Sequence, residues 1–151
     1  MYTLNEKISG LVPYEPISGT YKIRLDANES CFNLPADLME QLHLALDSLD
    51  FNRYPDPNAQ ELCAAFAGYY GIDAACVTAG NGSDELISII MNAFLMKGDT
   101  LVTVEPDFSM YRFYASLSEV HCIQVQKADS LTIDVDEVLR TVQKTGARAV
   151  I

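Results

Sequence analysis

The sequence predicts an α/β protein with three α/β/α layers and a mainly parallel sheet. Short apolar runs alternate with longer segments that have helical periodicity. Parallel strands need crossover segments of about ten residues or more, whereas a short hairpin can join only antiparallel strands. Nearly continuous apolar strands are typical of a sheet covered on both faces.

Residues 1–34 predict an extended N-terminal arm, because glycines and prolines interrupt any sustained period. One short strand is expected in the arm, at "YKIRL" (21–25). From Pro35 a helix is expected to about Leu49, since proline is tolerated in a first helical turn. Its apolar face consists of Leu38, Leu42, Leu46 and Leu49.

The irregular loop "DFNRYPDPN" (50–58) precedes a second helix. Asn58 followed three residues later by Glu61 predicts a capping box, and Gly71 predicts the end of this helix. The run "ACVTA" (75–79) predicts a short buried strand. A glycine turn then leads into a helix that we expect Gly98 to end.

The remaining elements continue the alternation of strand and helix. Strands are expected at "TLVTVE" (100–105), "VHCIQVQ" (120–126) and "ARAVI" (147–151). The helix between the first two should begin near Asp107 or Ser109. Asp134 predicts the cap of the last helix and Gly146 its end. Because the last strand has nothing after it, we expect a fold that is incomplete at the C-terminus.

Charge and cysteine spacing exclude several classes of function. Ten Lys and Arg oppose twenty-one Asp and Glu, a formal net charge of −11, and no basic patch is visible for nucleic acid or anionic membranes. Four separated cysteines without a C-x-x-C pair argue against structural zinc, and we expect each to be a small, buried, reduced residue. No apolar run has the length of a membrane span, so a soluble cytoplasmic protein is the default expectation.

The turn Gly80-Asn81-Gly82 is suited to a phosphate. Glycines allow the backbone to approach a ligand closely, and the first N–H groups of the following helix have no partner within it. A plain tight connection and a dinucleotide fingerprint are the alternatives. For the latter, Glu105 has the spacing of a ribose-binding acid, but Glu85 stands where the third glycine belongs.

Three other segments each have a simple structural explanation. "RLDANES" (24–30) can form a turn, and "NRYPDP" (52–57) can be a rigid proline loop. In "EPDFSMYRFY" (105–114) the aromatic residues at helical spacing can be core residues. These explanations treat the segments as unrelated, although their order along the chain is specific.

The motifs "LDANES", "NRYPDP", "GNGSDELI" and "EPDFSMY" together resemble the N-terminal region of the histidinol-phosphate aminotransferases. These are pyridoxal-phosphate (PLP) enzymes of the class I/II aminotransferase superfamily, with the PLP-dependent transferase fold type I. The resemblance covers nearly all of the chain. It implies an arm at 1–34 and the first part of the PLP-binding large domain at 35–151. The rest of that domain and a C-terminal small domain would be absent.

The resemblance also implies the cofactor-binding residues. The backbone N–H groups of Ser83 and Asp84 would bind the PLP phosphate, and Phe108 would lie over the cofactor ring. Tyr54 would reach into the neighbouring subunit of a homodimer and bind its PLP phosphate. On the substrate side, Asn28 and Tyr14 match residues of the family's site.

The reaction implied by the family is amino transfer between an amino-phosphate substrate, histidinol phosphate, and the 2-oxo acid 2-oxoglutarate, in histidine biosynthesis. It requires a Schiff-base lysine, and none of the five lysines here lies in the family's lysine motif. We therefore expect a fragment that is inactive by itself and that self-associates through uncovered apolar surface. The alternatives are a threonine-phosphate decarboxylase of the same superfamily, a dinucleotide-binding oxidoreductase domain and a non-catalytic module.

Overall fold

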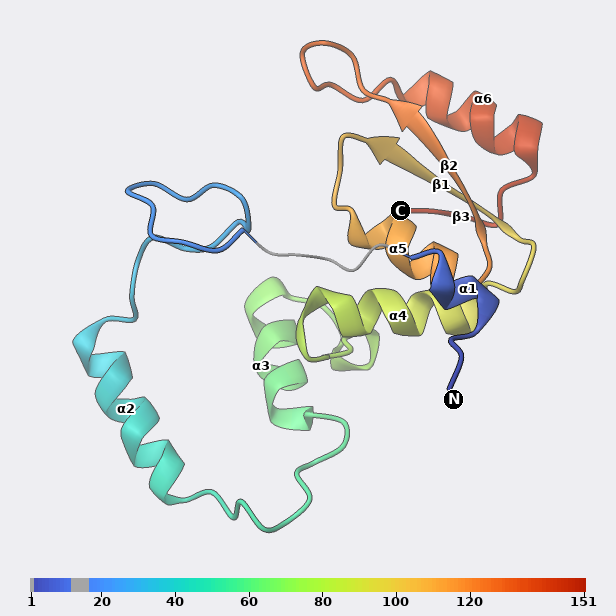
Figure 1. Ribbon diagram of the computed structural model, residues 1–151. Helices are drawn as coiled ribbons and strands as arrows, with labels where there is room; N and C mark the ends of the chain where they lie inside the picture. Colours follow the sequence, from blue (N-terminus) through green and yellow to red (C-terminus); the bar gives the residue numbers. More distant parts are fainter. Residues whose placement is uncertain (1, 12–16) are drawn as a thin grey trace.

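A small parallel sheet, formed by the C-terminal third of the chain, lies to one side of the protein (Figure 1). The computed structural model describes residues 2–11 and 17–151. The strand order is β2-β1-β3, with β1 (Thr100–Glu105) between β2 (His121–Gln126) and β3 (Ala149–Val150). Both pairings are parallel, as the sequence predicts. The strands predicted at 100–105, 120–126 and 147–151 are confirmed.

Helices cover both faces of this sheet. Helices α4 (Gly82–Phe94) and α5 (Met110–Leu117) lie on one side, and α6 (Val135–Thr145) lies on the other (Figure 1). The central strand is buried between them, because Leu101 is 1% exposed and its neighbour Val102 is 0% exposed. Successive side chains of a strand point to opposite faces, so each of these residues belongs to a different core layer. The predicted three-layer arrangement is confirmed.

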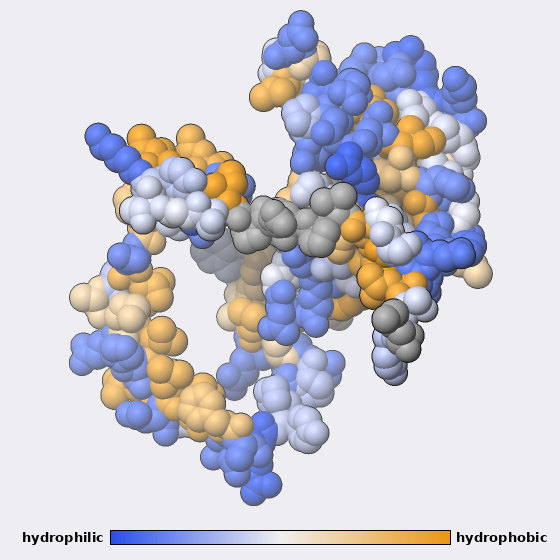
Figure 2. Space-filling model, viewed as in Figure 1, coloured by the Kyte–Doolittle hydropathy of each residue, from blue (hydrophilic) through white to orange (hydrophobic). Residues whose placement is uncertain are grey.

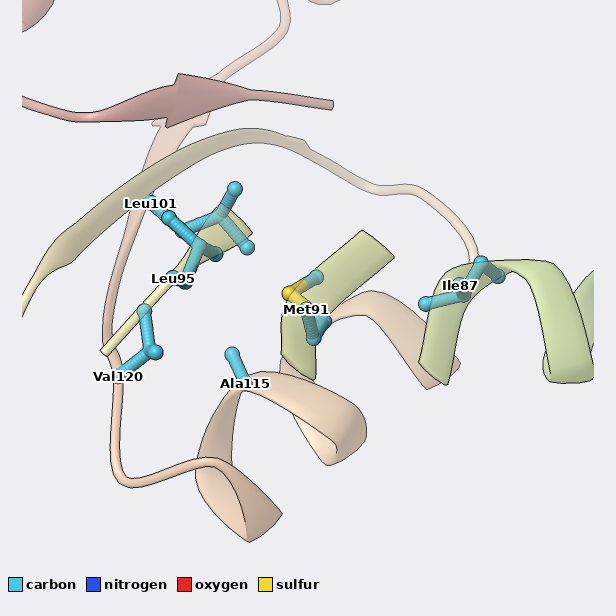
Figure 3. Close-up of a cluster of buried hydrophobic side chains, with 6 residues drawn as sticks. All are labelled: Ile87, Met91, Leu95, Leu101, Ala115 and Val120. Carbon is cyan, nitrogen blue, oxygen red and sulfur yellow. The ribbon is translucent and has the colours of Figure 1, made fainter. Parts of the chain in front are cut away.

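The larger core layer joins α4 and α5 to β1. Met91, at the middle of this layer, is fully buried and lies among side chains from all three elements (Figure 3). The cluster consists of Ile87, Met91, Leu95, Leu101, Ala115 and Val120. Packing of this layer therefore fixes α4 and α5 on one face of the sheet.

The ends of α6 are those that the sequence predicts. Asp134 accepts a hydrogen bond from the backbone N–H of Glu137 at 3.0 Å. At the other end Gly146 has φ 63°, and its N–H donates to the carbonyl of Val142. An aspartate at the N-cap and a left-handed glycine satisfy backbone groups that the helix itself leaves unpaired.

Helix α3 (Gln60–Tyr70) begins differently from the prediction. Asn58 does not cap it; the carboxylate of Asp56 accepts the N–H groups of Asn58 at 3.0 Å and Gln60 at 2.7 Å. These amides, Gln60 first, hold the pKa of Asp56 below its ordinary value. A carboxylate two residues earlier thus competes successfully with the Asn58 side chain. The predicted end at Gly71, with φ 68°, is confirmed.

The run 75–79 is not a strand. Asp73 accepts the N–H of Ala75 at 2.9 Å and starts the 3₁₀ turn η1 (Ala74–Cys76). Val77 has an extended backbone, but no strand of the described residues lies beside it to form a ladder. The prediction of a buried strand here is therefore wrong for this structure.

Two further predictions are corrected. Residues 21–25 form no strand, and the described part of the arm contains instead a short helix, α1 (Glu6–Ser9). Helix α4 ends at Phe94, before Gly98. Leu95 is extended because its side chain turns into the core, where it is 6% exposed.

The helix predicted from Pro35 is present as α2 (Ala36–Asp47) but is not covered. None of its residues is buried, and apolar side chains gather along it (Figure 2). Large exposed apolar side chains occur in the arm as well. Uncovered apolar surface of this kind promotes association. Self-association of the chain stays a prediction.

Replacing Met91 by Ala should destabilise the protein by about 2–5 kcal/mol, because it leaves a cavity at the centre of the α4–α5–β1 layer. Ile89→Ala is the matched control, since Ile89 lies on the same helix and is 50% exposed. Chemical denaturation of both variants measures the difference. Equal losses of stability for the two variants would show that Met91 is not at the centre of the core.

The carboxylate of Asp56 should titrate below about 3.9, the ordinary pKa of aspartate. A lowered folded-state pKa means that its stabilising contribution is present above that ordinary value. The contribution is lost as the pH falls through the folded pKa. The backbone amide shifts of Gln60 and Asn58, followed by NMR, should report this midpoint, and Asp56→Asn should abolish the titration. A midpoint at or above 3.9 would refute the capping role.

Candidate functional site

The glycine turn before α4 needs glycine at two positions for different reasons. The N–H of Gly82 donates to the carbonyl of Gly80 at 2.9 Å, and Gly82 has φ 78°, which side-chain-bearing residues rarely adopt. A Cβ on Gly80 would lie 2.9 Å from Cδ2 of Leu86. Gly82 is therefore required by backbone conformation and Gly80 by close packing.

The turn leaves two backbone donors without acceptors. In residues 2–11 and 17–151 no hydrogen bond is formed by the N–H groups of Ser83 and Asp84, and the Asn81 side chain does not cap the helix. The first turn of a helix also carries a partial positive charge. These amides are therefore free to bind an anion, and Ser83 is exposed to solvent.

The two acids after the turn are directed toward the protein. Oδ1 of Asp84 is buried and has no hydrogen-bond partner within the described residues. The carboxylate of Glu85 folds back and accepts the N–H of Asn81. A phosphate monoester dianion has no proton to donate to Asp84, so the burial of this oxygen agrees with a carboxylate turned away from a bound anion. The backbone N–H groups of Ser83 and Asp84 therefore remain the donors that an anion at this turn would meet.

Phe108 lies in the loop between β1 and α5, which begins with a cis peptide bond between Glu105 and Pro106. Its backbone N–H donates to Asp107, and its ring meets the ring of Tyr111 edge to face at 5.7 Å. Phe108 is 45% exposed. A partly exposed ring held on one side by a second aromatic residue can offer a face to a flat ligand.

Phe108 lines a hollow of about 40 Å³ at the carboxyl end of β1, together with residues that include Thr103, Tyr111 and Arg112. The carboxylate of Glu105 accepts a hydrogen bond there from the amide of Gln124 on β2. The dinucleotide alternative requires Glu105 to bind a ribose, but this hydrogen bond already occupies its carboxylate. The alternation of side chains places Glu105 and Gln124 on one face of the two paired strands, but the sequence alone does not show that they are bonded.

The structure brings some predicted site residues onto one packed unit and leaves others apart. Ser83 and Asp84 begin α4, Phe108 precedes α5, and these helices pack on each other. Tyr54 is fully exposed, and Asn28 is exposed with φ 52°, both in loops flanking α2. Tyr14 lies outside the described residues.

Neither a metal site nor a disulfide is formed by the described residues. The expectation that every cysteine is buried is wrong, because Cys31 and Cys76 are exposed. Burial raises the pKa of the partly buried Cys122 thiol, which keeps it protonated. Among the described helices, none combines the length and the apolar character that crossing a membrane requires.

The family profile of aminotransferase class I and II matches residues 20–151. The chain belongs to this family. The histidinol-phosphate aminotransferase of Clostridium kluyveri is 38% identical over 136 residues, which cover 90% of this chain and 39% of that protein. The corresponding protein of Thermococcus kodakarensis is 38% identical over 144 residues, which cover 95% of this chain and 42% of that protein. The resemblance of the four motifs is confirmed.

Solved structures of aminotransferases have the same fold. Histidinol-phosphate aminotransferase from Sinorhizobium meliloti, in complex with PLP, superposes with a TM-score of 0.74 at 25% identity, covering 82% of this chain and 33% of that one. Aromatic aminotransferase from Pyrococcus horikoshii superposes with a TM-score of 0.68 at 25% sequence identity. The match covers 81% of this chain and 35% of that one. This chain spans about two fifths of the length of the curated relatives.

Gly82→Ala should destabilise the turn by about 1–2 kcal/mol, because alanine must adopt the left-handed conformation. Gly68→Ala is the control: Gly68 is inside α3, and a Cβ there meets nothing within 4 Å. Alanine should stabilise that helix by about 0.5–1 kcal/mol. Thermal unfolding compares the two, and effects of the same sign would contradict the proposed need for glycine at the turn.

Proposed function

We propose that this chain forms the N-terminal, PLP-binding part of an aminotransferase that converts histidinol phosphate and 2-oxoglutarate in histidine biosynthesis. Family membership and the histidinol-phosphate aminotransferases among its relatives support this assignment. The observation that carries it is the glycine turn with two unpaired backbone donors at the start of α4.

The described residues fit the phosphate and ring of PLP. The N–H groups of Ser83 and Asp84 would hold the phosphate, since glycine at position 82 allows the turn and the helix dipole favours negative charge. Phe108 would pack against the ring and exclude water from one face. Bound PLP supplies an electron sink, while these groups bind and orient it.

The remaining residues of the proposed site complete it from a second subunit and from the arm. Tyr54 would donate its hydroxyl to the PLP phosphate of the partner in a homodimer. Its full exposure and its place in a proline-containing loop agree with presentation across an interface. Asn28 and Tyr14 would lie on the substrate side. The arm at 1–34 and the large-domain segment at 35–151 are part of this proposal.

None of the lysines in this chain is proposed as catalytic. Lys97 forms a 2.6 Å salt bridge with Glu119, and Lys7 donates to the carbonyl of Leu117. Both interactions lie away from the glycine turn in sequence: Leu117 is the last residue of α5, and Glu119 lies in the turn after it. We propose that the chain binds the cofactor but does not catalyse transamination by itself.

Binding of pyridoxine 5′-phosphate tests the cofactor site, because this analogue lacks the aldehyde that reacts with surface lysines. The chain should bind it saturably, inorganic phosphate should compete, and Phe108→Ala should weaken binding by about 2- to 12-fold through loss of ring packing. Phe94→Ala is the control, since Phe94 is exposed at the far end of α4. Isothermal titration calorimetry gives the affinities. Lack of saturable binding, or equal affinity for Phe108→Ala and wild type, would refute the site.

The absence of a catalytic lysine is tested separately with PLP and borohydride. Reduction should leave scattered, substoichiometric labelling of lysines, and amino transfer from histidinol phosphate should stay at the level of free PLP. Mass spectrometry locates the label. Stoichiometric labelling of one lysine would overturn this part of the proposal while leaving phosphate binding intact.

A further inference from the structure

The side chain of Glu85 closes the glycine turn from within. Its Oε2 accepts the N–H of Asn81 and lies 3.1 Å from the place that a Cβ on Gly80 would take. The missing side chain of Gly80 therefore makes room for the carboxylate. In the described part of the chain, no other side chain forms a hydrogen bond to residues 80–82.

This contact constrains a segment that has few other constraints. Two of its three residues are glycines, which lose the most conformational freedom on folding. The Asn81 side chain does not cap α4, and the only backbone bond within the turn joins Gly82 to Gly80. The Glu85 carboxylate thus connects the first turn of α4 to the loop before it, as in the reciprocal half of a capping box.

We propose that Glu85 is a positioning residue for the phosphate of PLP, an inference that rests on the proposed function. By binding Asn81 it holds the turn in the conformation in which the N–H groups of Ser83 and Asp84 stay unpaired and available. Glu85 itself does not touch the phosphate. Its negative charge opposes a phosphate dianion, so its benefit must come from the hydrogen bond.

The competing explanation is that Glu85 acts only through its charge at the positive end of the helix dipole, where Asp84 also lies. A dipole effect depends on the negative charge of the side chain and not on its length. Positioning depends on a hydrogen-bond acceptor at the correct distance from the Asn81 N–H and not on the charge. Glu85→Gln and Glu85→Asp separate the two, because Gln keeps the acceptor and reach whereas Asp keeps the charge and is shorter.

The experiment measures pyridoxine 5′-phosphate affinity by calorimetry and exchange of the Asn81 amide hydrogen by NMR, the latter without ligand. Glu85→Ala and Glu85→Asp should bind about 5- to 10-fold more weakly and lose protection at Asn81. Glu85→Gln should bind as tightly as wild type or more tightly and keep protection. Glu61→Ala is the matched control, because Glu61 is a first-turn acid of α3.

Wild-type affinity in Glu85→Asp, or weak binding by Glu85→Gln, overturns the positioning role. If Glu85→Ala does not fold, the Asp and Gln variants still give the comparison. If wild type fails to bind the analogue, the proposed function fails, whereas the Asn81 exchange pattern still shows whether Glu85 holds the turn. Unchanged Asn81 protection in Glu85→Asp overturns the proposal independently of ligand.

Discussion

Burial of β1 on both faces is the constraint on which the other elements depend. Leu101 requires α4 and α5 on one side, while Val102 belongs to the layer that α6 covers. The strand supplies hydrogen bonds to both neighbours, so it cannot occupy an edge of this sheet. Once α4 is fixed in this way, the turn that precedes it is fixed at its C-terminal end, and the loop after β1 carries Phe108 toward α5.

The sequence predicts elements well where local chemistry and tertiary packing agree. Asp134 and Gly146 end α6 as expected because each satisfies backbone groups of that helix alone. Prediction fails where two local signals compete: Asp56 displaces Asn58 as the anchor of α3, and Asp73 starts a 3₁₀ turn inside an apolar run. Leu95 leaves α4 early because burial in the core outweighs helix continuation, which no local pattern reveals.

The residues of the candidate site likewise divide into those that the sequence pattern indicates and those that it does not. The turn and the helix after it can be predicted from the sequence, because the glycine spacing has few structural explanations. The assignments of Ser83, Asp84 and Phe108 to the site stay predictions that the geometry supports. Only family resemblance indicates Tyr54 and Asn28, since exposed loop residues leave no periodic signal. The contacts of Glu85 with Asn81 and of Glu105 with Gln124 have no signal in the sequence. A carboxylate that folds back onto a turn or pairs with a neighbouring strand is defined by three-dimensional proximity.

The unpaired donors of the turn are main-chain atoms, and this has an evolutionary consequence. Substitution at positions 83 or 84 preserves an N–H group whichever side chain is encoded, proline excepted. Selection on the proposed anion binding would therefore act chiefly on the residues that shape the path of the chain, which here are Gly80, Gly82 and Glu85. Homologous proteins can diverge widely around such a turn without losing its donors, and divergence there is a poor measure of lost binding capacity.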